Sequence, residues 1–180
     1  MGTGSEHDVA PEESAYRRMI LELVGDNDPA EVQAGTSVAL RERVATADAA
    51  GVLRRRPEPR EWSVAELVGH MLDAEIYSAA RYRWVLGHDR PALEGYDQDL
   101  IADASRHGEA DMEVLLTALD GLRGANLELW GRSTADERAR EGVHAERGPS
   151  TYEVLFREMA GHDRFHLDQI DRTIEAVRPA

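Results

Sequence analysis

The feature that most constrains the fold of this chain is a long amphipathic helix with a well-defined start. Ser63-Val64-Ala65-Glu66 forms a capping box, in which the first and fourth side chains satisfy each other's backbone N–H groups. Trp62 precedes the box, in position for a hydrophobic staple against Leu67. The helical pattern predicts a helix from 63 to about 86. At 3.6 residues per turn, one stripe of it holds Leu67, His70, Ala74, Tyr77, Arg81 and Trp84.

A second capping box, Ser150-Thr151-Tyr152-Glu153, predicts the start of the last helix directly after Gly148-Pro149. One stripe of this helix holds Leu155, Met159, His162, His166 and Gln169. Two helices of this length cannot bury their apolar faces alone, so each needs further helices or a sheet to pack against.

The rest of the chain supplies helices rather than strands. Helical spacing predicts a short helix over 12–24, a helix over 37–53 with Thr36 as its N-cap, and a long helix over 109–130. Residues 87–99 and 131–148 are expected to be connections, the second with a helical turn near 135–140. No strand pattern stands out. The sequence therefore predicts an all-α fold, a four-helix bundle with a short extra N-terminal helix. Residues 1–11 are expected to be a disordered tail, and 12–178 a single domain.

Composition excludes several classes of function. The chain has no cysteine, so disulfides, thiolate metal sites and a cysteine nucleophile are all excluded. Its 35 acidic and 21 basic residues give a formal net charge of −14, which disfavours nucleic acid and anionic membranes as partners. No segment has the pattern of a signal peptide or of a membrane span. We therefore expect a cytoplasmic protein that acts on a small molecule.

The pair His162 and His166 is the first candidate for a functional site. Residues four apart lie on the same face of a helix and can share one cation. Such a pair alone is weak evidence, because a solvated or hydrogen-bonded pair is an equally good interpretation. His70 strengthens the case, since it lies on the inward stripe of another helix. Three histidines facing the interior of one bundle could hold a metal and leave one position open, which is typical of catalytic sites.

The other histidines are expected at the surface, although His144 belongs to a loop that could lie over a site. These residues are His7, His88, His107 and His144. The helix of a zinc peptidase is excluded, because H-E-x-x-H requires glutamate where this chain has Asp163.

Two blocks of sequence resemble the DinB-like (YfiT-like) superfamily of metalloenzymes. Residues 61–75, around His70, look like the second-helix block of that superfamily, and 161–170, around His162 and His166, are similar to its last-helix block. Residues 81–83 and 96–99 also look like features of the superfamily, and the similar region covers roughly 16–175.

The resemblance implies a bundle of up-down-down-up topology, which is often a homodimer. It also implies a divalent metal, zinc or nickel, bound by His70, His162 and His166. Members of the superfamily include S-transferases that use bacillithiol or glutathione and a related mycothiol-dependent isomerase. This implies a role in stress or detoxification.

An open metal position has two natural uses. It can activate water, as in a hydrolase, or bind a thiol as a thiolate, as in a thiol transferase. Because the chain has no cysteine, a thiol would have to come from a co-substrate. A non-catalytic, stress-related bundle with a structural metal is the remaining alternative.

Four side chains are candidate catalytic residues. Asp73 lies one turn from His70, and Asp163 adjoins His162, so either could orient an imidazole or move a proton. Tyr77 and Arg81 continue the stripe of His70 and could hold an anionic group of the substrate.

Overall fold

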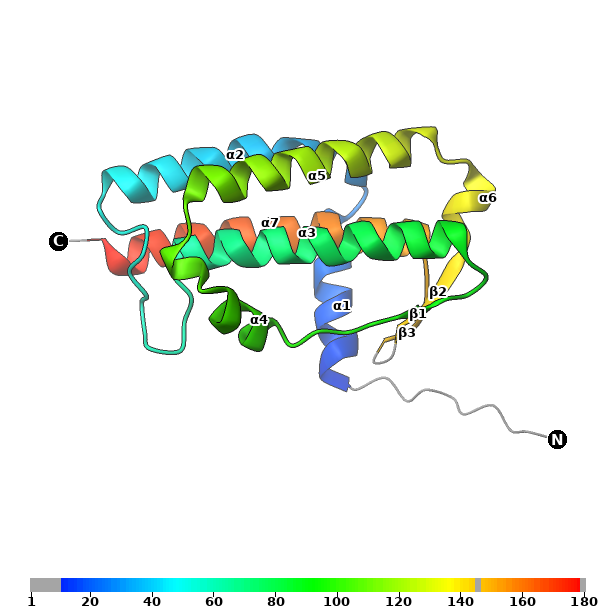
Figure 1. Ribbon diagram of the computed structural model, residues 1–180, viewed down its shortest axis with the longest axis horizontal. Coiled ribbons are helices and arrows are strands. Elements are labelled where there is room, and N and C mark those ends of the chain that lie inside the picture. The colour runs from blue at the N-terminus through cyan, green and yellow to red at the C-terminus, as the bar shows by residue number, and fades with distance from the viewer. Residues whose placement is uncertain (1–10, 145–146, 179–180) are drawn as a thin grey trace.

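The computed structural model describes residues 11–144 and 147–178, and of residues 11–14 only the backbone. The predicted tail thus lies outside the described residues except for Pro11, which begins the first helix. Four long helices make up the bundle (Figure 1): α2 (Pro29–Ala49), α3 (Val64–Gly87), α5 (Met112–Arg132) and α7 (Tyr152–Val177). The smaller elements are α1 (Pro11–Val24), β1 (Ala92–Leu93), α4 (Gln98–Ser105), the 3-10 turn η1 (His107–Glu109), α6 (Ala135–Arg138), β2 (Glu141–His144) and β3 (Gly148–Thr151).

The bundle has the predicted up-down-down-up topology. Helices α2 and α7 run in one direction, and α3 and α5 run in the opposite one (Figure 1). Helix α7 packs between α2 and α3, and α5 packs against the same two helices on the other side. This all-α four-helix arrangement confirms the fold class that helical periodicity predicted.

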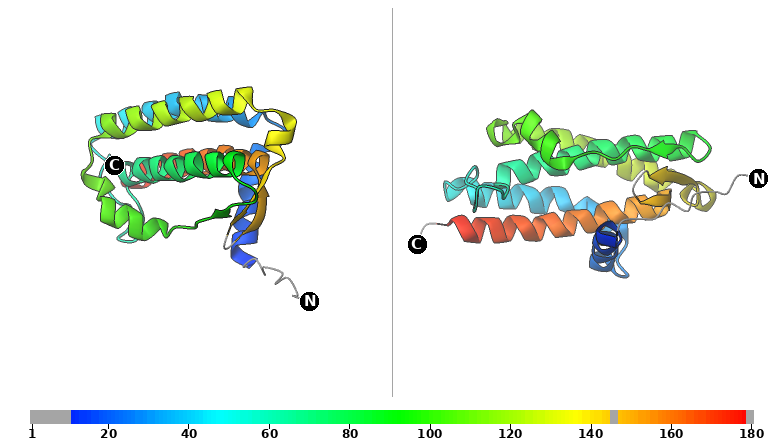
Figure 2. Two further views of the ribbon diagram at one scale, coloured as in Figure 1. Left: turned by 45° about the vertical axis from the view of Figure 1, so that its right-hand side comes forward. Right: turned by 90° about the horizontal axis from the view of Figure 1, so that it is seen from below.

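The extra helix α1 lies across the bundle rather than along it and packs against α7 (Figures 1 and 2). The contact depends on Gly161, because a Cβ atom there would stand 1.9 Å from the backbone oxygen of Ile20. The absence of a side chain lets the two backbones approach closely. Helix α1 is thereby held over the part of α7 that carries His162.

The interior has two apolar regions with a polar layer between them. One apolar region includes Leu40, Leu67, Met71, Leu119 and Ile170, and the other is aromatic, with Tyr82, Trp130, Tyr152 and Phe156. Buried polar side chains occupy the intervening turns of all four long helices. We call this set the polar layer; it consists of Gln33, Thr36, Glu75, Arg123, Asn126 and Asp163.

The start of α2 differs from the prediction. The helix begins at Pro29, and Asp28 is its N-cap, with a side-chain oxygen that accepts from the Ala30 N–H at 2.7 Å. Proline at the first helical position after an aspartate is a strong start signal. Thr36 therefore lies inside the helix, so its prediction as the N-cap was wrong. Its hydroxyl contacts the Val32 carbonyl and the Asp163 carboxylate instead.

The start of α3 is as predicted, and that of α7 is shifted by one residue. The Ser63–Glu66 capping box forms, with the Ser63 N–H donating to Glu66 Oε2 at 2.8 Å. At α7 the N-cap is Thr151 rather than Ser150, and the Thr151 hydroxyl accepts from the Val154 N–H. Ser150 is the last but one residue of β3.

The connections contain structure that the sequence did not predict. Strand β2 pairs in parallel with β1 and antiparallel with β3, and this small sheet lies at one end of the bundle (Figure 2). The strands have two to four residues, too few to show an alternating pattern. Helix α4 and η1 likewise lie between α3 and α5. Along the described part of the chain, no helix is long and apolar enough to cross a membrane.

Candidate metal centre

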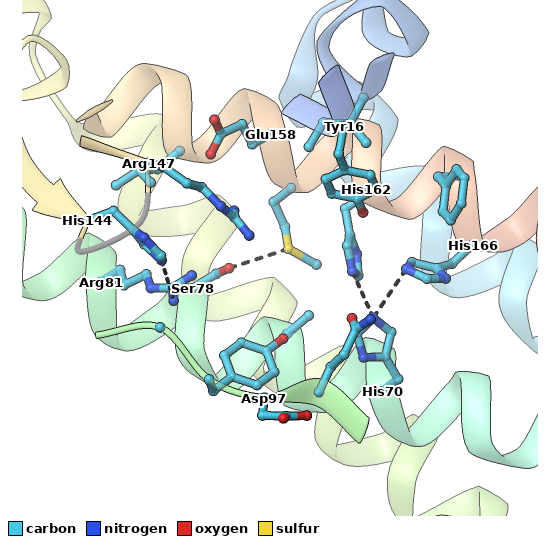
Figure 3. A pocket seen from close by; sticks show the side chains of 18 of the residues that line it. Tyr16, His70, Ser78, Arg81, Asp97, His144, Arg147, Glu158, His162 and His166 are labelled. Carbon is cyan, nitrogen blue, oxygen red and sulfur yellow. Dashed lines mark hydrogen bonds between the residues drawn. The ribbon is translucent and has the colours of Figure 1, made fainter. Parts of the chain in front are cut away.

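Three imidazoles from two adjacent helices converge on one point. His70 projects from α3, and His162 and His166 project from successive turns of α7 (Figure 3). The His70 Nε2 atom lies 3.1 Å from Nε2 of His162 and 3.2 Å from Nε2 of His166. The structure thus brings together the three histidines that the sequence singled out. We call them the histidine triad.

Burial keeps these imidazoles neutral. Burial, followed by the charges of His166 and His107, lowers the pKa of His70 to about 3. Burial also lowers the pKa of His166 to about 4, although a hydrogen bond to Gln169 opposes the change, and it lowers the pKa of His162 well below its usual value. A neutral imidazole has one nitrogen with a free lone pair, which is the form that binds metals.

Gln169 determines which nitrogen of His166 is available. Its Oε1 lies 2.9 Å from Nδ1 of His166, and an amide oxygen can only accept. The proton of His166 therefore resides on Nδ1, and its Nε2 presents a lone pair to the centre of the triad. This arrangement, in which the outer nitrogen donates to an acceptor, is the usual support for a metal-binding histidine.

The contacts within the triad fit a bound cation. Nε2 of His70 can donate at most one hydrogen, yet it lies against two other nitrogens. Tetrahedral zinc, with Zn–N bonds of about 2.0–2.1 Å, places its nitrogen ligands roughly 3.3 Å apart. The two distances from His70 are close to this value, all three ligand atoms lie within 4.8 Å of one another, and the all-imidazole donor set suits a divalent ion such as zinc or nickel.

Trp62 and Gln169 support the triad in ways that the sequence did not predict. The Trp62 ring lies over the imidazole of His70, with the ring centroids 4.8 Å apart. The sequence pattern places Trp62 only in a hydrophobic staple and Gln169 only on the stripe of α7. The position of Gln169, three residues after His166 on the same face, is a signal that could have revealed its role.

The triad opens into a pocket of about 630 Å³, a volume typical of sites for small molecules. Besides the triad, the pocket is lined by Trp62, Ser78, Arg81, Tyr96, Glu158 and Met159, among other residues. Figure 3 shows the triad at one end and Arg81, His144 and Arg147 at the other. The Tyr77 ring stacks on Tyr96 at a centroid distance of 3.9 Å, and the Arg81 guanidinium lies 6.0 Å from both ring centroids.

Asp73 has a partner other than the triad. Its Oδ2 lies 2.6 Å from Nε2 of His107, which is buried in η1. Gly69 makes room for this imidazole, because a Cβ at Gly69 would stand 2.1 Å from its Cγ. The expectation of a surface position for His107 was therefore wrong. No hydrogen bond joins Asp73 to His70 among the described residues.

Asp163 also points away from the triad. It is fully buried in the polar layer, where Arg123 donates to both of its oxygens at 2.5 and 3.1 Å and Thr36 donates to one at 2.9 Å. Successive residues of a helix are rotated by about 100°, so the side chain after His162 faces another direction. Because Nδ1 of His162 has no partner among the described residues, the expected orientation of this imidazole by Asp163 is not present in the structure.

The remaining histidines divide between the interior and the surface. His144 of β2 is buried, with its Nε2 3.3 Å from Arg81 Nη2, so the expectation of a surface position was wrong for it as well. Its location beside the pocket agrees with the other possibility, a loop that lies over the site. His88 is exposed, as expected. His7 lies outside the described residues.

Comparisons with known proteins point to one family. The sequence profile of the DinB superfamily matches residues 36–170. The "Putative metal-dependent hydrolase YfiT" of Bacillus subtilis is 26% identical over 114 residues, which cover 61% of this chain and 62% of the relative. A "Putative metal-dependent hydrolase" of Geobacillus thermodenitrificans is 31% identical over 61 residues, 34% of each chain. These matches span less than two thirds of the length of either relative.

A solved structure has the same fold. It is that of YfiT from Bacillus subtilis, described as "a probable metal-dependent hydrolase with an unusual four-helix bundle topology". It superimposes with a TM-score of 0.74 at 22% identity and covers 81% of this chain and 83% of that one.

Proposed function

Because the chain belongs to the DinB superfamily, we propose that it is a metal-dependent enzyme that acts on a small molecule. His70, His162 and His166 hold a divalent ion, zinc or nickel, at the end of the pocket. The observation that carries this proposal is the convergence of three neutral Nε2 atoms on one point at the wall of a cavity. A purely structural site would instead be closed by a fourth protein ligand.

Among the reactions open to such a site, we propose transfer of a low-molecular-weight thiol, of the bacillithiol, mycothiol or glutathione type. A divalent ion bound there would supply a Lewis acid that lowers the pKa of a bound thiol or water. The two carboxylates that the sequence suggested as supports of the triad, Asp73 and Asp163, are engaged with His107 and Arg123. Neither is placed to act as a general base. This favours a thiol, which a metal deprotonates without a dedicated base.

Metal-dependent hydrolysis is the second candidate, and the names of the relatives favour it. Within the pocket, the chain itself would orient the reacting groups. Gln169 fixes the tautomer of His166, and Trp62 restricts the ring of His70 from its face. The role of the reaction in stress or detoxification rests on membership of the superfamily.

Metal analysis of protein purified without a histidine tag tests the metal centre. We expect about one equivalent of zinc or nickel per chain in the wild type and in a His88→Ala control, because His88 is exposed and caps the C-terminal end of α3, away from the triad. The His166→Ala variant should retain little metal. Less than about 0.2 equivalents in the wild type after reconstitution would rule out the site, given the affinity expected of such a metal centre.

Turnover assays separate the two reactions. Metal-loaded protein should accelerate conjugation of glutathione, mycothiol or bacillithiol to an electrophile such as 1-chloro-2,4-dinitrobenzene. Acceleration of ester or amide hydrolysis alone, with no dependence on any thiol, would favour the hydrolase. In both cases His166→Ala should abolish the rate and His88→Ala should leave it unchanged.

A further inference from the structure

We propose that Arg81 forms an anion subsite at the end of the pocket away from the histidine triad, and that it binds a carboxylate of the substrate. This inference rests on the proposed function, which places the reacting group of the substrate at the triad. It identifies the substrate as an extended small molecule with a carboxylate at a distance from its reactive end.

The hydrogen bonding of Arg81 is incomplete. The residue exposes only 9% of its surface, yet among the described residues its buried Nε has no hydrogen-bond partner. Within the described part of the chain, its Nη2 contacts the Glu94 carbonyl and Nε2 of His144. No carboxylate lies within ion-pairing distance of the guanidinium in the described residues. A buried charge without a counter-ion is costly, and a ligand carboxylate would satisfy both the charge and the free donor.

One of the acidic residues that line this pocket already has a partner. Glu158 lines the same pocket, but its Oε1 accepts from Nε of Arg17, a residue of α1. A second cation, Arg147, reaches into the pocket from the β2–β3 side (Figure 3). Burial and then the charge of Arg147 lower the pKa of Arg81. In a protein of formal net charge −14, a cationic pocket end is a local feature that attracts an anion.

The separation between subsite and triad defines the length of the ligand. Arg81 follows His70 by eleven residues on α3, which corresponds to about 16 Å along the helix axis. Both side chains reach into one continuous cavity. The Tyr96 ring, which stacks on Tyr77 and lies beside Arg81, lines the cavity and provides an apolar wall for the part of the ligand between its two ends. A compact acid could not contact both ends.

Thiols with a terminal carboxylate can measure the distance between the histidine triad and Arg81. We would use cobalt-substituted protein, in which thiolate coordination gives a charge-transfer absorption band, and titrate 3-mercaptopropionate, 6-mercaptohexanoate and 8-mercaptooctanoate. Each acid is paired with the alcohol of the same chain length. We expect the longer acids to bind roughly 10- to 100-fold more tightly than their alcohols, the range of a charge-assisted hydrogen bond. The shortest pair should show no such preference.

Variants assign the preference to Arg81. Arg81→Gln should remove the advantage of the longer acids, and Arg81→Lys, which keeps the charge but loses the planar fork, should retain part of it. Arg172→Gln is the matched control, because Arg172 is an exposed residue of α7 paired with Asp168. Melting temperatures verify that each variant is folded.

The outcomes separate the anion subsite from the metal chemistry. Equal binding of acids and alcohols by the wild type would overturn the subsite, as would a preference already present at the shortest length. Absence of the thiolate band with every ligand would overturn the thiol reaction instead. In that case adipate, which has no thiol, still tests Arg81 by calorimetry. Weaker binding of adipate to Arg81→Gln than to wild type supports the subsite, and equal or absent binding overturns it. Tighter binding of inorganic phosphate than of adipate would overturn the proposal of a carboxylate and indicate a phosphate group at Arg81.

Discussion

The polar layer and the histidine triad are two buried polar clusters on the same helices, and they satisfy their polar groups in opposite ways. In the polar layer, Arg123 donates to Glu75 and Asp163, and Asn126 donates to Glu75. Burial opposes the charge of Arg123, but the two carboxylates raise its pKa. In the triad, three nitrogens converge on one point with too few hydrogens to bond them.

The two clusters differ in whether the chain itself supplies the partners of their polar groups. The carboxylates and the guanidinium of the polar layer find their partners within the chain, so this cluster can contribute to a unique packing of four helices without any ligand. The triad requires something from outside the chain. On α7 the two clusters alternate, because His162 and His166 share one face while Asp163 lies on another. A single helix therefore serves both the fold and the site.

The largest expected effect is the loss of Arg123. Arg123→Met leaves Glu75 and Asp163 buried without their cation, and we expect the free energy of unfolding to fall by about 3–5 kcal/mol. Urea denaturation measures this. Arg132→Met is the control, because the exposed pair of Arg132 with Glu128 should contribute less than about 1 kcal/mol. If both variants lose equally little, the polar layer does not stabilise the bundle as we describe.

Removal of the metal should destabilise the protein through the triad alone. A metal present at a thousand times its Kd stabilises the folded state by about 4 kcal/mol, so a chelator should lower Tm by roughly 10 °C. In His162→Ala the chelator should have no effect, because the site is already lost. The polar layer should remain intact in metal-free wild type and in His162→Ala. Arg123→Met should therefore lower the free energy of unfolding of the metal-free protein by the same amount as in the metal-bound protein. A chelator effect that persists in His162→Ala would place the metal elsewhere.

The long helices and the triad could be predicted because their signals are local. The Ser63–Glu66 capping box, the 3.6-residue spacing and the i, i+4 pair of His162 and His166 are all read within one or two turns. The assignment of His70 to the same site needed only the further step that inward stripes of one bundle meet. These are the features that the structure reproduces.

The parts that could not be predicted depend on partners distant in sequence. The direction of Asp163 is set by Arg123, forty residues away, and His107 is buried because Gly69 leaves room for it. The burial of His144 depends on β2, whose partners β1 and β3 are too short to recognise alone. Without those contacts, an aspartate beside a histidine looks like a support for the metal, and a loop histidine looks exposed.

A smaller effect should follow from the loss of Gln169. Gln169→Leu removes the acceptor that holds the proton of His166 on Nδ1, and we expect metal affinity to fall about 10- to 100-fold. Competition with a chromogenic chelator measures the affinity. Asp168→Asn, on the neighbouring exposed position, should leave it unchanged. An unchanged affinity in Gln169→Leu would mean that the triad is oriented by packing alone.

The smallest expected effect on metal binding comes from Asp73. Its substitution tests whether this carboxylate, one turn from His70, supports only the fold or also the metal site. Because its carboxylate contacts His107 rather than His70, Asp73→Asn should reduce the free energy of unfolding by about 1 kcal/mol and change metal affinity by no more than about twofold. His107→Ala should lower stability without changing metal affinity either. A tenfold loss of metal affinity in Asp73→Asn but not in His107→Ala would instead show that Asp73 supports His70. The metal site would then include a residue of α3 one turn beyond His70.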